Sequence, residues 1–259
     1  MKYTLALLAI VSSFAQPTFA ADGARPLKAL LIAGGCCHDY ARQKNLIKEG
    51  LEARVNVVVD VVYSTDTSTK AKFEPYEKPD WAKGYDLIIH DECSADVKEM
   101  AYVQNVLAPH KAGVPAINLH CAMHSYRTGT DDWFRFCGIQ SASHGPQKPI
   151  EVSFVNGDHP ATKGLKGWTT GNEELYNNIK IFPTATPLAR GKQIVPGKDG
   201  SSRTDDYVVV WANDYQGAKV FNTTLGHNNL LVGDSRYLDL LARGFVWATG
   251  RPEALKPAK

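Results

Sequence analysis

The chain has 259 residues, of which 44% are hydrophobic and 22% charged, with 21 glycines and 14 prolines. These fractions are typical of globular proteins, and they exclude a disordered, collagen-like or coiled-coil chain. The formal net charge is +2, and no basic run or basic-aromatic stripe occurs, so the composition gives no case for a nucleic-acid partner.

Residues 1–20 are predicted to be a cleaved signal peptide. Lys2 precedes an apolar run of about a dozen residues, and small residues lead to a cleavage site after Ala20. A buried N-terminal helix is the alternative. The run is shorter than the ~20 apolar residues of a membrane span, and no later stretch approaches that length. We therefore expect a periplasmic or secreted protein without a membrane span.

Apolar runs alternate with amphipathic stretches through the first half of the chain. The first run ends at Gly34-Gly35, which we interpret as a tight turn that needs glycine, because no phosphate-loop motif is present. Continuous apolar strands that alternate with helices indicate a parallel sheet covered on both faces. The predicted strands are 27–33, 55–62, 85–90 and 114–119, the predicted helices are 42–53 and 96–110, and 64–83 is predicted to be a loop.

The second half of the chain is less regular. It contains no internal repeat or linker, so we predict a single domain over residues 25–250 and a C-terminal tail over 251–259. The predicted fold class is α/β, a three-layer, open, mostly parallel sheet with helices on both faces. Here the predicted strands are 150–155, 208–211 and 218–221, the turns are 156–160 and 213–217, the polar loop is 197–206, and the terminal helix is 237–248.

Polar side chains follow three of the predicted strands, in segments 34–39, 90–93 and 120–124. Ligands bind outside the carboxyl ends of parallel strands, so we expect these segments to share one cleft with four histidines. Histidine and carboxylate together either ligate zinc or a similar divalent ion, or act as general acid and base near neutral pH. The spacing of His120 and His124 would let them share a metal on a helix, although no HExxH motif is present.

Residues 114–124 resemble a nucleophile elbow, a strand that turns sharply into a helix with a reactive residue at the apex. The apex falls on His120, which argues against a glutaminase. A shift of one residue would make Cys121 the nucleophile.

The chain has five cysteines, which cannot all pair internally. No CxxC motif occurs, so a thioredoxin motif and a zinc ribbon are excluded. The adjacent Cys36 and Cys37 are not expected to bridge each other. We expect the cysteines to be small buried apolar residues, namely Cys36, Cys37, Cys93, Cys121 and Cys137.

Several patches, in order along about 220 residues, resemble the ThuA-like (trehalose-utilisation) family. The most specific patch runs from the strand ending at Trp211 through a glycine turn to Leu225-Gly-His227 and a closing helix that ends at Gly250. Glu173 departs from the family, in which Asp is common. The remaining patches are Gly34-Gly35 with His38-Asp39, Leu119–Ala122, Phe136–Gly138 with His144, and Asp158–Pro160 with Glu173–Tyr176.

The resemblance implies a flavodoxin-like fold, similar to class I glutamine amidotransferases but without a working nucleophile, and a role in the use of trehalose or other glycosides. It also directs attention to particular side chains. The candidates are His120 and Glu174 for catalysis, Asp39, Asp91, His144 and Tyr176 for substrate binding, and His38, His120 and His227 for a divalent metal such as zinc.

Two functions compete. The first is a hydrolase, hydratase or isomerase that acts on a sugar or glycoside, including an oxidised one, without glutaminase activity. The second is a non-catalytic sugar-binding or interaction protein, in which tryptophans would stack on sugar rings. A thiol-handling role of Cys121 is a third hypothesis, and His110 is expected to face solvent at a helix end. The tryptophans concerned are Trp81, Trp133, Trp168 and Trp211.

Overall fold

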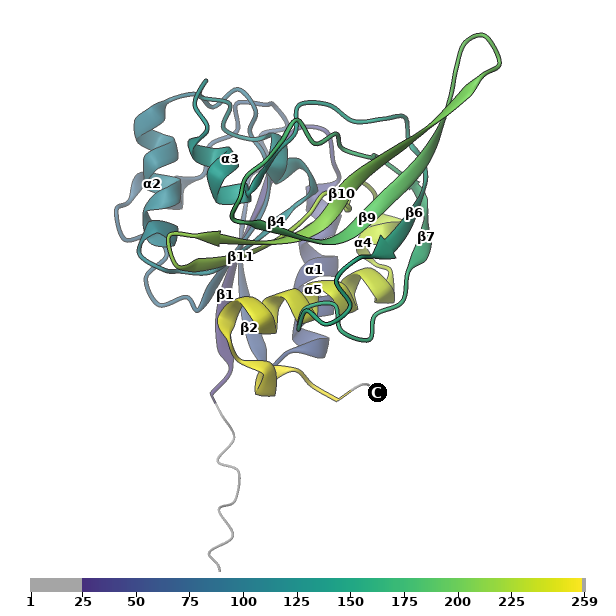
Figure 1. The fold of residues 1–259 in the computed structure, drawn as a ribbon. Coiled ribbons are helices and arrows are strands. Elements are labelled where there is room, and N and C mark those ends of the chain that lie inside the picture. The colour runs from purple at the N-terminus through teal and green to yellow at the C-terminus, as the bar shows by residue number, and fades with distance from the viewer. Residues whose placement is uncertain (1–24, 258–259) are drawn as a thin grey trace, which may run out of the picture.

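The structure is a computed structural model that describes residues 25–257, so the predicted signal peptide lies outside the described residues. Its centre is a nine-stranded sheet, in which the first five strands of the spatial order run parallel and the rest are antiparallel (Figure 1). The order is β2 (Val57–Tyr63), β1 (Leu27–Gly35), β3 (Leu87–Cys93), β4 (Ala116–Leu119), β11 (Ala218–Thr223), β10 (Ser202–Tyr215), β9 (Ala185–Pro196), β6 (Lys148–Phe154) and β7 (Trp168–Glu173).

Helices cover both faces of this sheet and create two separate apolar cores (Figure 1). The predicted three-layer α/β class is therefore confirmed. Within residues 25–257, no helix combines the length and apolar character needed to cross a bilayer. One face carries α1 (Tyr40–Arg54), α4 (Asn229–Val232) and α5 (Ser235–Thr249), and the other carries the 3₁₀ helix η1 (Glu74–Glu77), α2 (Met100–Lys111) and α3 (Asp132–Cys137).

The remaining elements are short. The 3₁₀ helix η2 (His120–His124) follows β4 directly, and η3 (Pro252–Ala254) follows α5. The strands β5 (Ile139–Gln140) and β8 (Lys180–Ile181) form a separate antiparallel pair.

The terminal helix α5 shows how the sequence specifies its packing. Its buried positions include Leu238, Leu241 and Phe245, whose three- and four-residue spacing places them on one face of the helix. Gly244 lies on the same side, where an added Cβ would meet the ring of Phe221 at 2.4 Å. This glycine therefore lets the helix approach β11 closely enough to cover the sheet.

Two strand boundaries differ from the predictions in ways that change the fold, and two long strands are absent from the predictions. Strand β3 continues through Cys93, because its polar residues stay paired with the end of β1. Strand β10 begins at Ser202, inside the segment predicted as a polar loop, because it pairs with β9 as a long hairpin. Strands β7 and β9 were not predicted, since their residues alternate between buried and exposed positions amid many polar side chains.

The extension of β3 corrects the expectation of one shared cleft. His90 and Glu92 point into the core below α2, where His90 Nδ1 lies 2.9 Å from Glu92 Oε1 and His90 Nε2 lies 3.1 Å from His110 Nε2. The hydroxyls of Tyr76 and Tyr126 donate to the same carboxylate oxygen at 3.0 Å. All five residues are fully buried, so the expected solvent position of His110 is wrong as well.

Candidate functional site

The turn after β1 brings His38 to the carboxyl edge of the sheet. Gly34 and Gly35 have φ values of +144° and +95°, which favour glycine. A Cβ at Gly35 would lie 2.2 Å from the carbonyl oxygen of Cys93, so the two strand ends touch only because the side chain is absent. Glycine is needed here as expected, but the turn itself begins at Cys36, because Gly34 and Gly35 are still part of β1 and pair with Glu92 and Cys93.

The turn after β4 places His120 beside His38. His120 has a φ of +41° at the first position of η2, which confirms His120 as the apex residue. Its Nδ1 lies 2.6 Å from the carbonyl oxygen of Thr224. Since a carbonyl only accepts hydrogen bonds, Nδ1 carries the proton, and the lone pair of the neutral ring is on Nε2.

Two consecutive glutamates at the end of β7 complete the arrangement. The carboxylate of Glu173 accepts the backbone N–H of His227 at 3.1 Å and that of Glu174 at 2.9 Å. It is buried within the sheet edge. Glu173 therefore fixes the backbone on which both Glu174 and His227 stand.

The Glu174 carboxylate faces three imidazoles. Its Oε2 lies 3.3 Å from His227 Nδ1, 3.5 Å from His120 Nε2 and 3.7 Å from His144 Nε2. Burial acts to raise the pKa of Glu174, but contacts with His120 and His227 outweigh it and hold that pKa far below its usual value. The same contact raises the pKa of His227, although its alignment falls short of hydrogen-bond geometry. The group is therefore a carboxylate at neutral pH.

Three histidines converge beside this carboxylate. Ring nitrogens of His38, His120 and His227 lie within 4.8 Å of one another. His38 Nδ1 lies 3.3 Å from the backbone oxygen of His227, so this ring also keeps its lone pair on Nε2. Burial, followed by the neighbouring charges of His120 and His227, lowers the pKa of His38 to about 2. The ring is neutral, as a metal ligand must be.

Tyr176 and His124 line the inner side of this cluster. The Tyr176 hydroxyl lies 3.2 Å from His120 Nε2 and can donate to its lone pair. The His124 ring stacks on Tyr176 at 4.0 Å, and its Nε2 lies 2.8 Å from the Ser141 hydroxyl. η2 is a 3₁₀ helix, in which residues three apart rather than four apart align, so the shared metal expected of His120 and His124 stays a prediction.

The two aspartates predicted to bind substrate occupy different settings. Asp39 is exposed at the mouth of the site, where it caps α1 and accepts a hydrogen bond from the Asn229 amide at 2.7 Å. Asp91 is only 5% exposed, and burial followed by the charge of Glu92 raises its pKa well above the usual value. The structure does not bring Asp91 to the histidine cluster, and its substrate contact stays a prediction.

Sequence reasoning missed the role of Gln43. Its side-chain amide on α1 donates to the carbonyl oxygens of Gly226 at 3.2 Å and His227 at 3.1 Å. The residue is 1% exposed. No motif marks it, because its function depends on a segment more than 180 residues away in the sequence.

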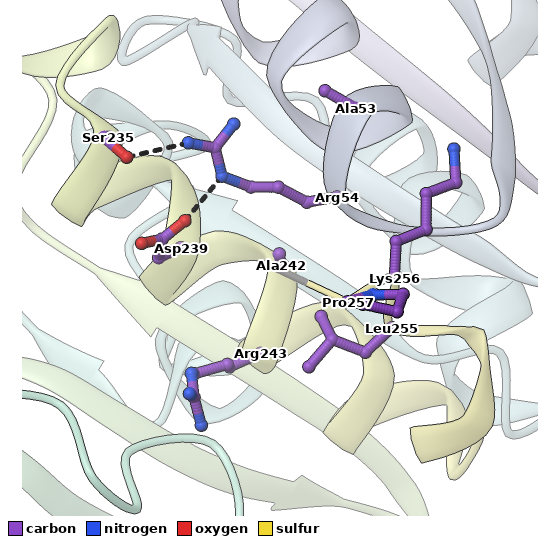
Figure 2. Close-up of a pocket in the computed structure, with 9 residues that line it drawn as sticks. All are labelled: Ala53, Arg54, Ser235, Asp239, Ala242, Arg243, Leu255, Lys256 and Pro257. Carbon is purple, nitrogen blue, oxygen red and sulfur yellow. Dashed lines mark hydrogen bonds and ion pairs between the residues drawn. The ribbon is translucent and has the colours of Figure 1, made fainter. Parts of the chain in front are cut away.

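A hollow of about 460 Å³ opens over this edge of the sheet, and Cys37, His38, Asp39 and His227 are among its lining residues. The hollow reaches the cluster at His38 and His227, whereas Glu174, His120 and His144 are not among its lining residues. A second hollow, of about 440 Å³, lies at the opposite edge between α1 and α5 (Figure 2). There Arg54 pairs with Asp239 at 2.6 Å, and none of the residues lining that hollow is a histidine.

The cysteines correct two predictions. Cys36 and Cys37 form a disulfide across one peptide bond, which the left-handed backbone at Cys37 (φ +83°) accommodates. Cys93 and Cys121 form the second disulfide, so Cys121 holds no thiol with which to act as a nucleophile in this state. Cys137 is free and buried, as expected.

The tryptophans do not form a sugar-stacking surface. Each of the four is at most 8% exposed and belongs to one of the two apolar cores. They are core residues because their rings fill the space between sheet and helices. The residues are Trp81, Trp133, Trp168 and Trp211.

The fold and the site define an α/β protein with a histidine–carboxylate cluster at the carboxyl edge of its parallel strands. Residues 28–248 match the family model described as ThuA, trehalose utilisation. The chain belongs to this family.

Solved structures agree with the fold. A ThuA-like protein from Parabacteroides merdae matches at 20% identity over 90% of this chain and 93% of its own, with a TM-score of 0.70. A second from Bacteroides uniformis matches at 21% identity over 90% and 95%, with a TM-score of 0.62. The carbohydrate deacetylase Agd3 matches at 14% identity over 87% of this chain and 32% of its own, with a TM-score of 0.55. A search of curated proteins finds no match.

Proposed function

We propose that this protein is an enzyme that acts on a sugar or glycoside, including an oxidised one, as a hydrolase, hydratase or isomerase. The observation that carries the proposal is the Glu174 carboxylate, which faces His120, His144 and His227 within 3.7 Å beside an open hollow. The family description, trehalose utilisation, supports a carbohydrate substrate. Agd3, which contains a similar fold, is a carbohydrate deacetylase and supports the same class.

Glu174 supplies the negative charge of the site in this proposal, since a carboxylate whose pKa lies far below its usual value is a weak base. Its Oε1 accepts a hydrogen bond from the Gln147 amide at 3.2 Å, which leaves Oε2 directed at the imidazoles. A sugar hydroxyl or water placed in the hollow would donate a hydrogen bond to Oε2, and the carboxylate would stabilise the positive charge that an adjacent imidazole gains when it takes the proton. His144, whose side chain is 42% exposed, and Asp39 would hold the substrate at the entrance. A glutaminase reaction has no support, because the apex residue is His120.

The cluster fits a divalent metal such as zinc, held by His38, His120 and His227. In two of these rings Nδ1 faces a backbone carbonyl, the second contact that typically orients a metal-binding imidazole. Both rings therefore present Nε2, whose lone pair is the ligand that zinc requires. A bound cation would supply Lewis acidity toward a sugar oxygen or water.

Metal content tests this part of the proposal. We expect the purified protein to hold close to one equivalent of a divalent metal by elemental mass spectrometry. His38→Ala, His120→Ala and His227→Ala should each lose it, because three imidazoles are the smallest complete set. His159→Ala is the matched control, since its ring packs on Trp247 away from the cluster. A wild-type protein that takes up no metal from excess zinc, manganese or nickel would remove the metal from the mechanism.

Glu174→Gln tests the carboxylate. The amide keeps the shape of the side chain but carries no negative charge beside the imidazoles, so turnover should fall by about 10²–10⁴-fold. A screen of glycosides and 3-keto sugars provides the substrate, and circular dichroism confirms the fold. Wild-type turnover by this variant would show that the assignment is wrong. Saturable sugar binding without turnover in the whole screen would favour the non-catalytic binding protein instead.

We also propose that the protein acts outside the cytoplasm. The support is the sequence pattern of residues 1–20, with its short basic start, apolar run and small residues before the cut. N-terminal sequencing of the protein from its native host should begin at Ala21. A mature chain that keeps Met1 and is found in the cytoplasm would contradict this localisation.

A further inference from the structure

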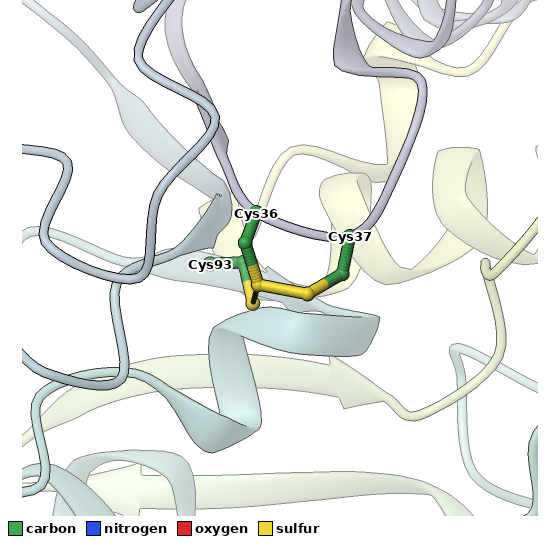
Figure 3. Close-up of side chains that lie close together, drawn as sticks. All are labelled: Cys36, Cys37 and Cys93. Atoms are coloured by element: carbon green, nitrogen blue, oxygen red, sulfur yellow. Dashed lines mark hydrogen bonds between the residues drawn. A yellow bond between two sulfur atoms is a disulfide. The ribbon is translucent and has the colours of Figure 1, made fainter.

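Four of the five cysteines form one continuous sulfur cluster. Cys36 is bonded to Cys37, Cys93 is bonded to Cys121, and the sulfurs of Cys36 and Cys93 lie 3.5 Å apart. Figure 3 shows the first disulfide with the Cys93 sulfur directly beside it. The two disulfides are therefore in van der Waals contact, at a separation from which a reacting pair of atoms can start.

The cluster is open to solvent at one end only. Cys37 is exposed and lines the hollow over the histidines. Cys36, Cys93 and Cys121 are 9%, 2% and 6% exposed. A thiol that arrives from solution therefore meets Cys37 first, because Cys37 is the exposed member of the cluster.

The contact between the two disulfides is part of the fold. Cys36 follows β1 and Cys93 ends β3, and these neighbouring strands are paired up to Gly35 and Cys93. The backbone N–H of Cys36 donates to the carbonyl oxygen of Cys93 at 3.3 Å. Gly35 has no Cβ and so permits this close approach. Backbone hydrogen bonds therefore hold the strand ends together independently of the sulfur chemistry.

We propose that these cysteines are a thiol–disulfide relay that carries reducing equivalents from an external dithiol to Cys121. One thiolate of the dithiol attacks the Cys37 sulfur, forms a mixed disulfide and releases the Cys36 thiolate. Cys36 then attacks Cys93, which forms a Cys36–Cys93 disulfide and releases Cys121 as a thiolate. The second thiol of the dithiol attacks the mixed disulfide, releases Cys37 and leaves as a cyclic disulfide.

These exchange steps transfer two electrons and two protons from the dithiol to the protein. The dithiol is oxidised to a disulfide, and the protein changes from two disulfides to one, with thiols at Cys37 and Cys121. The new thiol at Cys121 is next to His120 in the chain. The sulfurs of Cys93 and Cys121 and a ring nitrogen of His38 lie within 4.8 Å of one another. The relay therefore adds a sulfur donor to the histidine cluster under reducing conditions, whatever reaction that cluster performs.

Trapping the thiols tests the relay. The folded protein is treated with one equivalent of dithiothreitol, quenched with iodoacetamide at increasing times, and mapped by peptide mass spectrometry. We expect alkylation at Cys37 and Cys121, together with peptides cross-linked through Cys36 and Cys93. Alkylation of Cys36 and Cys37 with the Cys93–Cys121 bond intact would overturn the proposal. So would the absence of any reduction in the folded protein.

The Cys36→Ser variant separates the relay from direct reduction. It lacks the thiolate that attacks Cys93, so alkylation of Cys121 should slow by at least about tenfold. Release of Cys121 at the wild-type rate would mean that the dithiol reaches the buried disulfide directly, which contradicts the relay. Cys137→Ser is the matched control and should behave as wild type, because Cys137 is buried and forms no disulfide. The trapping pattern of the wild type remains decisive if the Cys36 variant does not fold.

Discussion

His110 shows what complete burial does to an imidazole in this protein. Burial, followed by the neighbouring His90, lowers its pKa to about 3, so the ring is neutral in the folded state. In the unfolded chain the pKa returns to about 6.5. The unfolded chain therefore binds the proton more readily at every pH between these values, and acid favours unfolding.

Acid should destabilise the folded protein through His110. The contribution of His110 is complete above pH 6.5 and is lost as the pH falls toward 3, at about 1.4 kcal/mol per pH unit. His110→Phe should reduce the slope of unfolding free energy against pH by about that amount, measured by urea unfolding between pH 7 and 5. The new ring would stack on Phe136, which the imidazole already contacts at 4.5 Å. An unchanged slope for His110→Phe would contradict the prediction.

Single residues were the least predictable part of the site. Residue type and position directly after a predicted strand pointed to His38 and His120. Only the resemblance to the ThuA-like family pointed to Glu174 and His227. The same reasoning wrongly added His90, because polar residues near a strand end look alike whether the strand stops before them or continues. Buried hydrogen bonds decide whether a strand stops before such residues or continues through them, and these bonds join residues far apart in the sequence.

At the scale of elements, the start of α1 links stability to the site. The Asp39 side chain accepts the backbone N–H of Arg42 at 3.3 Å and so caps the helix that carries Gln43. It also holds Asn229 at the beginning of α4. One carboxylate therefore joins two helices at the mouth of the hollow.

Asp39→Ala should lower the free energy of unfolding by about 1 kcal/mol or more, because both the cap and the Asn229 contact are lost. Asp39→Asn should cost less, since asparagine caps helices about as well as aspartate. Thermal unfolding of the two variants distinguishes these outcomes. Asp234→Ala, at the equivalent cap of α5, is the matched comparison and should lose the cap together with an ion pair to Arg236, but no contact between helices. Equal stability of Asp39→Ala and wild type would contradict this role.

The elements that could be predicted are those whose burial is uniform. Strands β1 and β4 are continuous apolar runs buried on both faces, and α5 has a single apolar face, so each pattern has one interpretation. Strand β9 buries the polar Gln193 and exposes the apolar Ile194, so its residue types do not mark which face is solvated. Without knowledge of its partners β6 and β10, that segment is indistinguishable from a polar loop.

At the scale of the whole molecule, β9 and β10 extend beyond the sheet as a two-stranded ribbon (Figure 1). Pairing of β9 with β6 ends at Lys192, whereas pairing with β10 continues to Pro196. Gln193 is the last residue of β9 whose side chain hydrogen-bonds to the sheet, to the carbonyl oxygens of Lys148 and Glu173. The ribbon past Gln193 therefore contributes little to the site.

Replacing residues 195–203 with Asn-Gly should preserve the fold and the histidine cluster. This dipeptide closes two-residue hairpins, and Ile194 and Thr204 already face each other in register. We expect the metal content to match that of the intact protein and the free energy of unfolding to change by less than about 1 kcal/mol. Loss of metal in a folded variant would show that the ribbon supports the cluster.

Glu173, at the end of antiparallel β7, binds the backbone that follows parallel strand β11, so the site forms only when segments distant in the sequence come together. The nitrogen of His38 and the backbone oxygen of His227 that it faces are 189 residues apart in the chain, and His120 and Thr224 are 104 apart. Contacts between distant segments form late, because the entropy of closing long loops opposes them until the rest of the chain is in place. During refolding from denaturant, the histidines would therefore assemble only when β4 pairs with β11, whose paired residues Leu119 and Thr223 are equally far apart in the chain. A chain caught before that step would have helices and local turns but none of its chemistry.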